Sequence, residues 1–139
     1  MRLGLAMLDN VSTLNNLKYL NQVQILPGET TVVRFQLIDV DTKSQTNQIG
    51  NRYIPANTPV APTMQITIQS VDDSKTITKA ATMSFPNDDR SIWEFPLSNL
   101  ETQNAAGVNL SIVLTENTSV KMALGKNVLS MSPSNIYQC

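Results

Sequence analysis

Apolar side chains recur at every second position through most of the chain. The clearest stretch is GVNLSIVLTE, in which Val108, Leu110, Ile112 and Leu114 share one register. Successive side chains of a β-strand point to opposite faces, so a period of two places these four residues on one face. The pattern therefore predicts half-buried strands that turn one face toward a core.

Turn signals separate about seven such stretches. The sequences PGE, DDSK, PNDDR and NTS lie between them, and their Pro, Gly, Asn and Asp residues favour turns. The expected strands fall in VQIL, TTVVRFQLIDV, TMQITIQSV, TITKAATMSF, SIWEFPL, GVNLSIVLTE and VKMALGKNVLSM. No long segment of helical period lies between them, which disfavours a parallel α/β sheet. We therefore expect an all-β fold, an immunoglobulin-like antiparallel β-sandwich of about seven strands.

The first twenty residues follow a different pattern. Leu14, Leu17 and Leu20 recur at every third position, which is typical of a short helical turn or an irregular arm. Such a segment is too short to be stable alone and needs a surface to dock on, either its own domain or a neighbouring subunit. On this hypothesis, deletion of residues 1–20 leaves a folded domain that no longer assembles.

The composition suits one domain with a polar but weakly charged surface. We expect residues 1–20 to form the N-terminal arm, residues 21–132 the β-sandwich domain and residues 133–139 a C-terminal tail. Charged residues make up only 15% of the 139 residues, and Asn, Gln, Ser and Thr take their place. The net charge of -1 gives little repulsion between copies, which favours self-association.

Several classes of chemistry lack their residues. Histidine is absent and the single cysteine is Cys139, so Ser-His-Asp and Cys-His catalysis, a structural zinc site and an internal disulfide are all disfavoured. The chain has neither phosphate-binding glycine motif, and we expect no cofactor and no metal ligands. Its ten Lys and Arg form no basic run, and no apolar run is long enough to span a bilayer. We therefore expect no direct contact with nucleic acid or membrane.

The stretch FPNDDRSIWEF places two carboxylates just before the only tryptophan. Asp88 and Asp89 beside Trp93 fit either an acidic site next to an aromatic platform or a turn that leads into a buried strand. Asp and Asn initiate turns, and a Trp within a sandwich strand usually packs in the core. A carboxylate-based hydrolase needs two carboxyls that face each other across a cleft. We interpret PNDDR as a turn and Trp93 as a core residue, and we expect no enzymatic activity.

Three stretches resemble a known group of proteins. RYIPANTPV, DDSKTITKAATMSFPNDDRSIWEFPLS and GVNLSIVLTE are similar to segments of small virion structural proteins of tailed bacteriophages, over roughly residues 21–116. The resemblance implies a single β-sandwich that is located in the virion as a non-enzymatic head, neck or tail component. Its implied partners are major capsid, portal, neck or tail proteins and copies of itself. It implies no catalytic residues.

Two further classes remain open as alternatives. One is a carbohydrate- or surface-binding adhesion module that uses Trp93, Tyr53 and the Asp88-Asp89 loop, and the other is a small carboxylate-based hydrolase. The candidate interaction residues are Leu14, Leu17, Leu20, Tyr53, Asp88 and Asp89.

Overall fold

The protein is built almost entirely of β-strands. The computed structural model describes residues 2–9, 11–26, 28–70, 76–98 and 105–131, without the side chains of residues 105, 106 and 131. Within this part there is one short 3-10 helix and no α-helix, so the all-β prediction is confirmed. The elements are β1 (Leu3–Leu8), β2 (Tyr19–Leu20), β3 (Val23–Gln24), β4 (Thr31–Asp39), η1 (Val40–Thr42), β5 (Asn51–Arg52), β6 (Thr63–Ser70), β7 (Thr76–Phe85), β8 (Asp89–Leu97), β9 (Ala105–Glu116) and β10 (Ser119–Met131).

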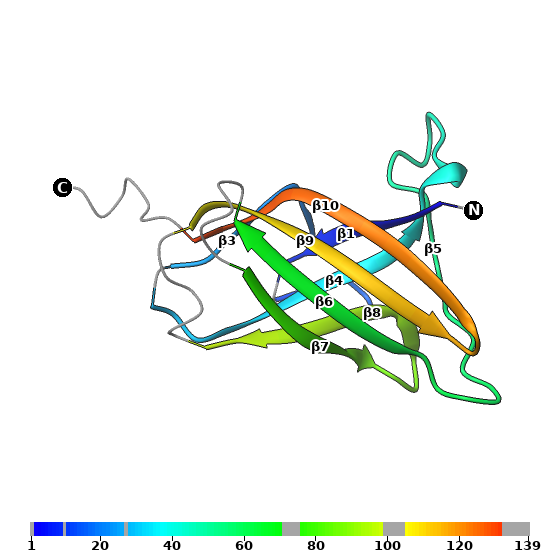
Figure 1. Cartoon of the computed structure of the whole chain (residues 1–139). Helices are drawn as coiled ribbons and strands as arrows, with labels where there is room; N and C mark the ends of the chain where they lie inside the picture. Colours follow the sequence, from blue (N-terminus) through cyan, green and yellow to red (C-terminus); the bar gives the residue numbers. More distant parts are fainter. Residues whose placement is uncertain (1, 10, 27, 71–75, 99–104, 132–139) are drawn as a thin grey trace.

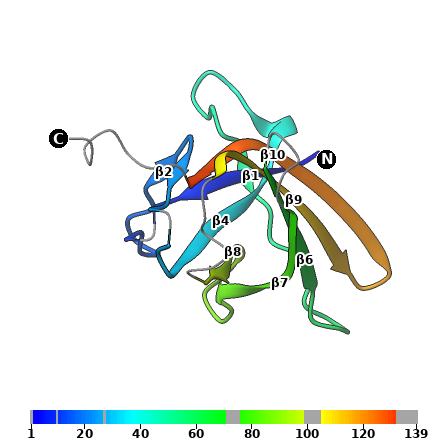
Figure 2. The same ribbon diagram turned by 60° about the vertical axis from the view of Figure 1, so that its left-hand side comes forward.

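The strands form one continuous sheet that curls upon itself. Their order is β2-β1-β4-β8-β7-β6-β9-β10-β3, and β5 adds to β4 (Figure 1). The pairs are antiparallel except for β10 with β3, so the sheet is mixed. The curl brings β1 back beside β10, and the result is nearly closed and barrel-like (Figure 2). This single sheet does not confirm the finer prediction of an immunoglobulin-like sandwich.

The corner of the sheet lies in β7. Its first part, up to Ala81, pairs with β6, and its last part, from Thr82, pairs with β8. The register with β8 shifts between Met83 and Phe85. Such an irregularity bends a strand and increases its twist, which lets one strand serve both halves of the curled sheet.

The core follows the alternation predicted from the sequence. Val108, Leu110, Ile112 and Leu114 are all buried, and Trp93 is only 1% exposed. The Trp93 indole donates to the carbonyl oxygen of Arg90 at 3.0 Å, which satisfies its polar atom inside the protein. The interpretation of Trp93 as a core residue is therefore confirmed.

The N-terminal segment differs from the expected arm. Residues Leu3–Leu8 form β1, which pairs with β4 along its whole length and buries Leu3, Met7 and Leu8. This strand was not predicted from the sequence, because Gly4 and Ala6 are small apolar residues and LGLAML therefore shows no alternation of apolar and polar positions. The sheet therefore begins at Leu3, ahead of the expected boundary at residue 21. The tail expected at residues 133–139 lies outside the described residues.

Residues 11–20 form no helix. They make a turn closed by a bridge between Thr13 and Asn16 and then the short strand β2. Ser12 is 5% exposed, and the guanidinium of Arg34 donates to its carbonyl oxygen. The leucines at every third position therefore belong to a loop that lies against β4, and the prediction of a helical turn is wrong.

Candidate functional site

The six candidate interaction residues do not gather at one place. Leu14 and Leu20 are 39% and 37% exposed on the segment that leads through β2. Tyr53 contacts the end of β9, whereas Asp88 and Asp89 lie where β7 turns into β8. Leu17, on the same segment as the other two leucines, is half-buried. The leucines thus belong to the N-terminal segment, whereas Tyr53, Asp88 and Asp89 come from the segment after β5 and the turn before β8.

Asp88 and Asp89 have different surroundings although they are adjacent. Asp88 is exposed in the turn, and its backbone N–H donates to the carbonyl oxygen of Phe85 at 3.1 Å. Asp89 is only 6% exposed. Its Oδ1 accepts from the N–H and the hydroxyl of Ser91 at 3.0 and 2.6 Å, and its Oδ2 accepts from Arg52 at 2.9 Å. The turn reading thus fits Asp88, while Asp89 is a buried, fully engaged carboxylate.

The surroundings of Asp89 favour its charged form. Burial alone would raise the pKa of this carboxyl, but hydrogen bonds from Ser91 and the contact with Arg52 outweigh it and hold the pKa below its ordinary value. A chain of hydrogen bonds continues from Ser91, whose hydroxyl accepts from Gln36 at 3.1 Å. Tyr19 in turn donates to Gln36 at 2.6 Å. This chain ties β2 to β4 and β8.

A second polar cluster surrounds Glu116 at the end of β9. Both carboxylate oxygens lie 2.7 Å from the Tyr53 hydroxyl, and Oε1 lies 2.8 Å from the Lys121 ammonium. The backbone N–H of Ala56 donates to Oε2 at 2.6 Å. Burial would raise the pKa of Glu116, but the hydrogen bonds from Lys121, Tyr53 and Ala56 outweigh it and lower the pKa. The hydrogen bond between Lys121 and Glu116 raises the pKa of Lys121.

The two clusters hold one segment between them. Arg52 binds Asp89 and the adjacent Tyr53 binds Glu116, so residues 52–56 are fixed from both sides. Arg90 adds bonds to the carbonyl oxygen of Pro55 at 3.3 and 3.4 Å. The carboxylates therefore attach the RYIP segment to the turn before β8 and to the β9–β10 hairpin. Among the described residues, no three Asp, Glu or Cys side chains gather as a metal site would require.

Sequence reasoning singled out Tyr53 but missed its partner. Glu116 closes the strongest alternating strand, and Lys121 follows five residues later across the NTS turn. An acid and a base on either side of a hairpin turn are a usable signal, because hairpin partners lie side by side. The ion pair of Arg52 with Asp89 could not be predicted in this way, because the two residues are 37 positions apart and no hairpin turn joins them.

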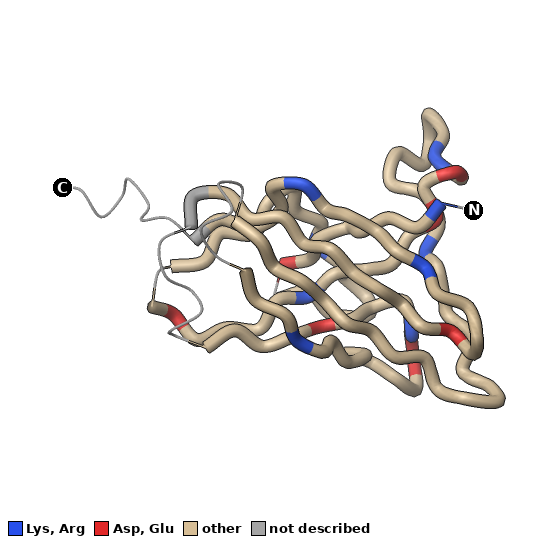
Figure 3. The backbone as a smooth tube through the Cα atoms, viewed as in Figure 1, with Lys and Arg blue, Asp and Glu red and all other residues tan. Residues whose placement is uncertain are grey.

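The outward side chains of β6 and β9, of β7 up to Ala80 and of β10 up to Leu124 form a broad surface without formal charge, and the exposed Lys126 of β10 lies beyond its end. Residues that pair across strands share a face, so Met122, Val113 and Gln65 form one row across it. In Figure 3 the tubes of β6 and β9 carry no charge along their middle lengths. We define the uncharged face by its outward residues, which are Thr76, Thr78, Ala80, Thr63, Gln65, Thr67, Gln69, Asn109, Ser111, Val113, Thr115, Val120, Met122 and Leu124.

Large apolar side chains line one border of the uncharged face. Val120, Met122 and Leu124 of β10 are 60%, 70% and 51% exposed. Met122 and Leu124 border a shallow hollow of about 360 Å³ that also includes Val113. Exposed apolar side chains that lie together mark contact surfaces more often than isolated ones do.

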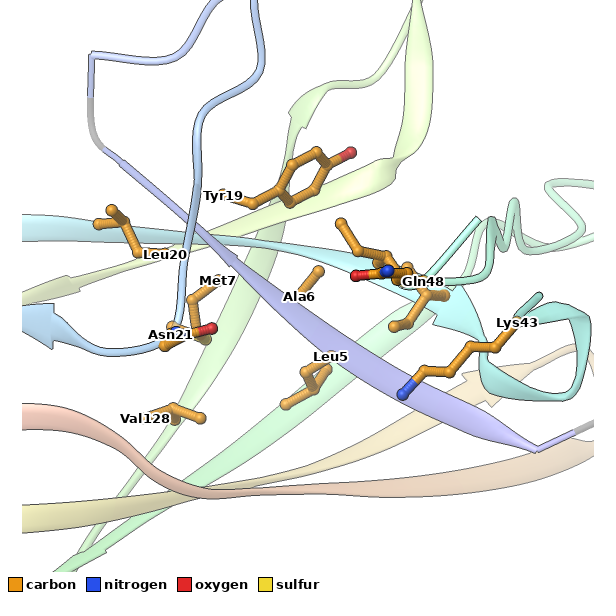
Figure 4. A pocket seen from close by; sticks show the side chains of 11 residues that line it. Leu5, Ala6, Met7, Tyr19, Leu20, Asn21, Lys43, Gln48 and Val128 are labelled. Carbon is orange, nitrogen blue, oxygen red and sulfur yellow. The ribbon is translucent and has the colours of Figure 1, made fainter. Parts of the chain in front are cut away.

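A groove of about 270 Å³ lies along β1 (Figure 4). Leu5 and Ala6 of β1 line it, together with Tyr19 of β2 and Val128 of β10. Lys43 reaches over it from the loop that follows η1. The groove is therefore bounded by residues of β1, β2, β4 and β10 and by the loop that follows η1.

Comparisons with known proteins give no relative: no protein-family model, no curated protein and no solved structure matches the chain. In the described part, no helix has the length and apolar character that a membrane span needs.

Proposed function

We propose that the chain is a non-enzymatic structural subunit of a bacteriophage virion, placed at the head, neck or tail. It acts through repeated contacts with copies of itself and with other virion proteins. The observation that carries the proposal is the uncharged face with its exposed border of Val120, Met122 and Leu124. The resemblance of residues 21–116 to small virion proteins supplies the setting.

The uncharged face suits a second copy of the chain as its occupant. Two such faces meet without bringing like charges together and without stripping water from a charged group, which is costly. Thr, Ser, Gln and Asn side chains both donate and accept hydrogen bonds, so each copy offers what the other needs. An interface made from one patch on both partners is the commonest symmetric arrangement of protein dimers.

The immunoglobulin-like sandwich belongs to the same proposal. It is supported by β7, which passes from one half of the sheet to the other, so that the two halves enclose a common core. Phe35 and Phe95 from the first half lie in one apolar cluster with Ile66 and Ile112 from the second. In this description β7 is the strand that both layers share.

The residues on which the adhesion alternative depends are buried or bonded within the protein. Trp93 is 1% exposed, so its ring offers no stacking surface for a sugar. The Tyr53 hydroxyl and the Asp89 carboxylate are engaged in internal hydrogen bonds. No described contact favours this alternative over assembly.

Purification of particles tests the proposal directly. The gene is expressed with an affinity tag in cells that produce the cognate phage, and the gradient-purified virions are analysed by quantitative mass spectrometry. The proposal expects the chain in the particles at a fixed number of copies. Its absence from washed particles, while the free protein is abundant in the lysate, contradicts the proposal.

A further inference from the structure

The floor of the groove along β1 is the seam where the curled sheet meets itself. β1 and β10 lie side by side there, and among the described residues no hydrogen-bonded ladder joins them. The Leu5 side chain closes the seam, since a β-carbon added at Gly125 would lie 3.5 Å from Leu5 Cδ1. Ile38 of β4 and Val128 of β10 extend this apolar floor. The seam has no room for a further strand, but a hollow of about 270 Å³ lies above it.

Two short segments form the rims of the groove. One is β2 with the residue that follows it, and the other is the loop after η1 (Figure 4). Within this loop the Gly50 N–H donates to the Asn47 side chain at 3.0 Å, and the Asn51 N–H donates to the Thr42 hydroxyl. Gly50 has a φ of +106°, and a β-carbon at this position would collide with the carbonyl oxygen of Asp39. The loop is therefore fixed against the end of β4, and the groove is preformed as ligand sites usually are.

Three polar side chains with unused hydrogen-bonding groups surround the groove. They are Asn21 on one rim and Lys43 and Gln48 on the other. No described residue forms a hydrogen bond or an ion pair with any of these three side chains. Lys43 is the only charged residue of the lining, and Figure 4 shows its ammonium extended toward β1. The groove therefore presents one positive charge beside an apolar floor.

A second groove, of about 300 Å³, carries the opposite charge. It lies between β3 and the start of β4, and its only charged lining residues are Asp9 and Glu29. Its lining also includes the apolar Leu8 and Ile25. The two grooves thus resemble each other in size and differ in the sign of their charge. Charge complementarity directs an anionic ligand to the groove along β1 and a cationic one away from it.

We propose that the groove along β1 binds an aliphatic monocarboxylate, with the carboxylate beside Lys43 and the hydrocarbon chain along Leu5 toward Val128. An exposed ion pair provides little affinity by itself, so burial of the chain on the apolar floor supplies most of it. The volume of the groove suits a small ligand, because pockets for drug-sized molecules begin at about 300 Å³. The proposal is independent of the uncharged face and of a place in a virion.

Titration of the full-length protein, followed by NMR of its backbone amides, tests the proposal. The main probe is octanoate. Octan-1-ol has the same chain without the charge, octylamine has the opposite charge, and acetate has the charge without the chain. Lys43→Gln removes the ammonium from an exposed position, and Lys126→Gln, at an exposed lysine of β10 that does not line the groove, is the matched control.

The proposal expects octanoate to shift the amide resonances of Leu5, Ala6 and Val128 saturably, with a Kd below about 1 mM. Octan-1-ol should bind about threefold to fivefold more weakly because it lacks the ion pair, and octylamine more weakly still. Acetate should bind at least about tenfold more weakly than octanoate because it buries no chain. Lys43→Gln lowers the affinity for octanoate to that for octan-1-ol, whereas Lys126→Gln leaves it unchanged.

Four results overturn the proposal. One is the absence of saturable shifts with octanoate up to about 1 mM, the weak limit of specific recognition. Another is equal affinity for octanoate and octan-1-ol, which removes the role of Lys43. A third is acetate binding as tight as that of octanoate, which assigns the site to a bare carboxylate such as an acidic side chain. The fourth is a set of shifts confined to Val113 and Leu124, which places the chain in the hollow of the uncharged face instead.

Discussion

The hydroxyl of Tyr53 lies 2.7 Å from both carboxylate oxygens of Glu116, which follows it by 63 residues in the chain. This contact joins the irregular segment after β5 to the hairpin of β9 and β10. The Lys121 ammonium completes it, at 2.8 Å from Glu116 and 5.8 Å from the centre of the Tyr53 ring. One end of the curled sheet is thus closed by three side chains from three elements.

Glu116→Gln should destabilise the protein. The Glu116 side chain is 11% exposed and that of Lys121 is 28% exposed, so loss of the carboxylate leaves a half-buried ammonium without its partner. The expected loss is about 1–3 kcal/mol in the free energy of unfolding, measured by urea denaturation. Asp88→Asn is the control, because Asp88 is exposed in its turn, and it should change stability by less than about 0.5 kcal/mol. Equal effects of the two substitutions would contradict the role of the cluster.

Stability should fall in acid. The pKa values of Asp89 and Glu116 are lowered in the folded protein, so their stabilising contribution is complete above their unfolded values of about 4. It is lost as the pH falls through the folded pKa values, because the unfolded chain then binds more protons. Urea midpoints measured between neutral pH and strong acid should decline, and Asp89→Asn should flatten the decline. An unchanged slope in that variant would count against the buried carboxylate.

Stability should also fall in alkali. Burial raises the pKa of Tyr53, and the hydrogen bond with Glu116 raises it further. The pKa of Tyr19 is raised by burial and by the nearby Asp89 carboxylate. A raised folded pKa gives stability that is complete below the unfolded value of about 10 and is lost as the pH rises through the folded one. Absorbance titration of tyrosinate should show ionisation above the pH found for the denatured protein, and coincident curves would refute this.

Removal of residues 1–8 should abolish cooperative folding. β1 pairs with six residues of β4 and contributes Leu3, Met7 and Leu8 to the interior, so its loss exposes a central strand edge and opens the core. Circular dichroism and thermal unfolding measure the effect. The exposed-position variant Val11→Ser is the control and should unfold as the wild type does, since Val11 is 62% exposed. A truncated chain that unfolds cooperatively at the wild-type temperature would restore the arm hypothesis.

The long strands could be predicted because each is long enough for the two-residue alternation to repeat several times. β6 and β9 bury every second side chain, and both were read correctly from the sequence. β3 falls within VQIL, which was expected as a strand. β2 and β5 could not be predicted, since two residues hold no period. Together with β1 they are the three strands beyond the expected seven.

The polar contacts were less accessible to sequence reasoning. Asp88 and Asp89 are chemically identical neighbours. Only Asp89 is buried and bonded to Arg52, which comes from a distant part of the chain, and the sequence does not show this contact. The uncharged face could have been anticipated from the Thr, Gln and Ser residues that alternate with the core positions. Its continuity across four strands depends on the registers, which the sequence does not state.

Self-association through the uncharged face is tested most directly by sedimentation velocity over a range of protein concentration. The account predicts that the wild type associates as its concentration rises, and that Met122→Lys weakens this association at least about tenfold, because an interface core tolerates an unpaired charge poorly. Val11→Lys is the matched control, since Val11 is 62% exposed on the turn before β2, which pairs with β1 and not with a strand of the face, and it should behave as the wild type. A wild type that stays monomeric at every concentration, or equal weakening by the two lysines, contradicts the account.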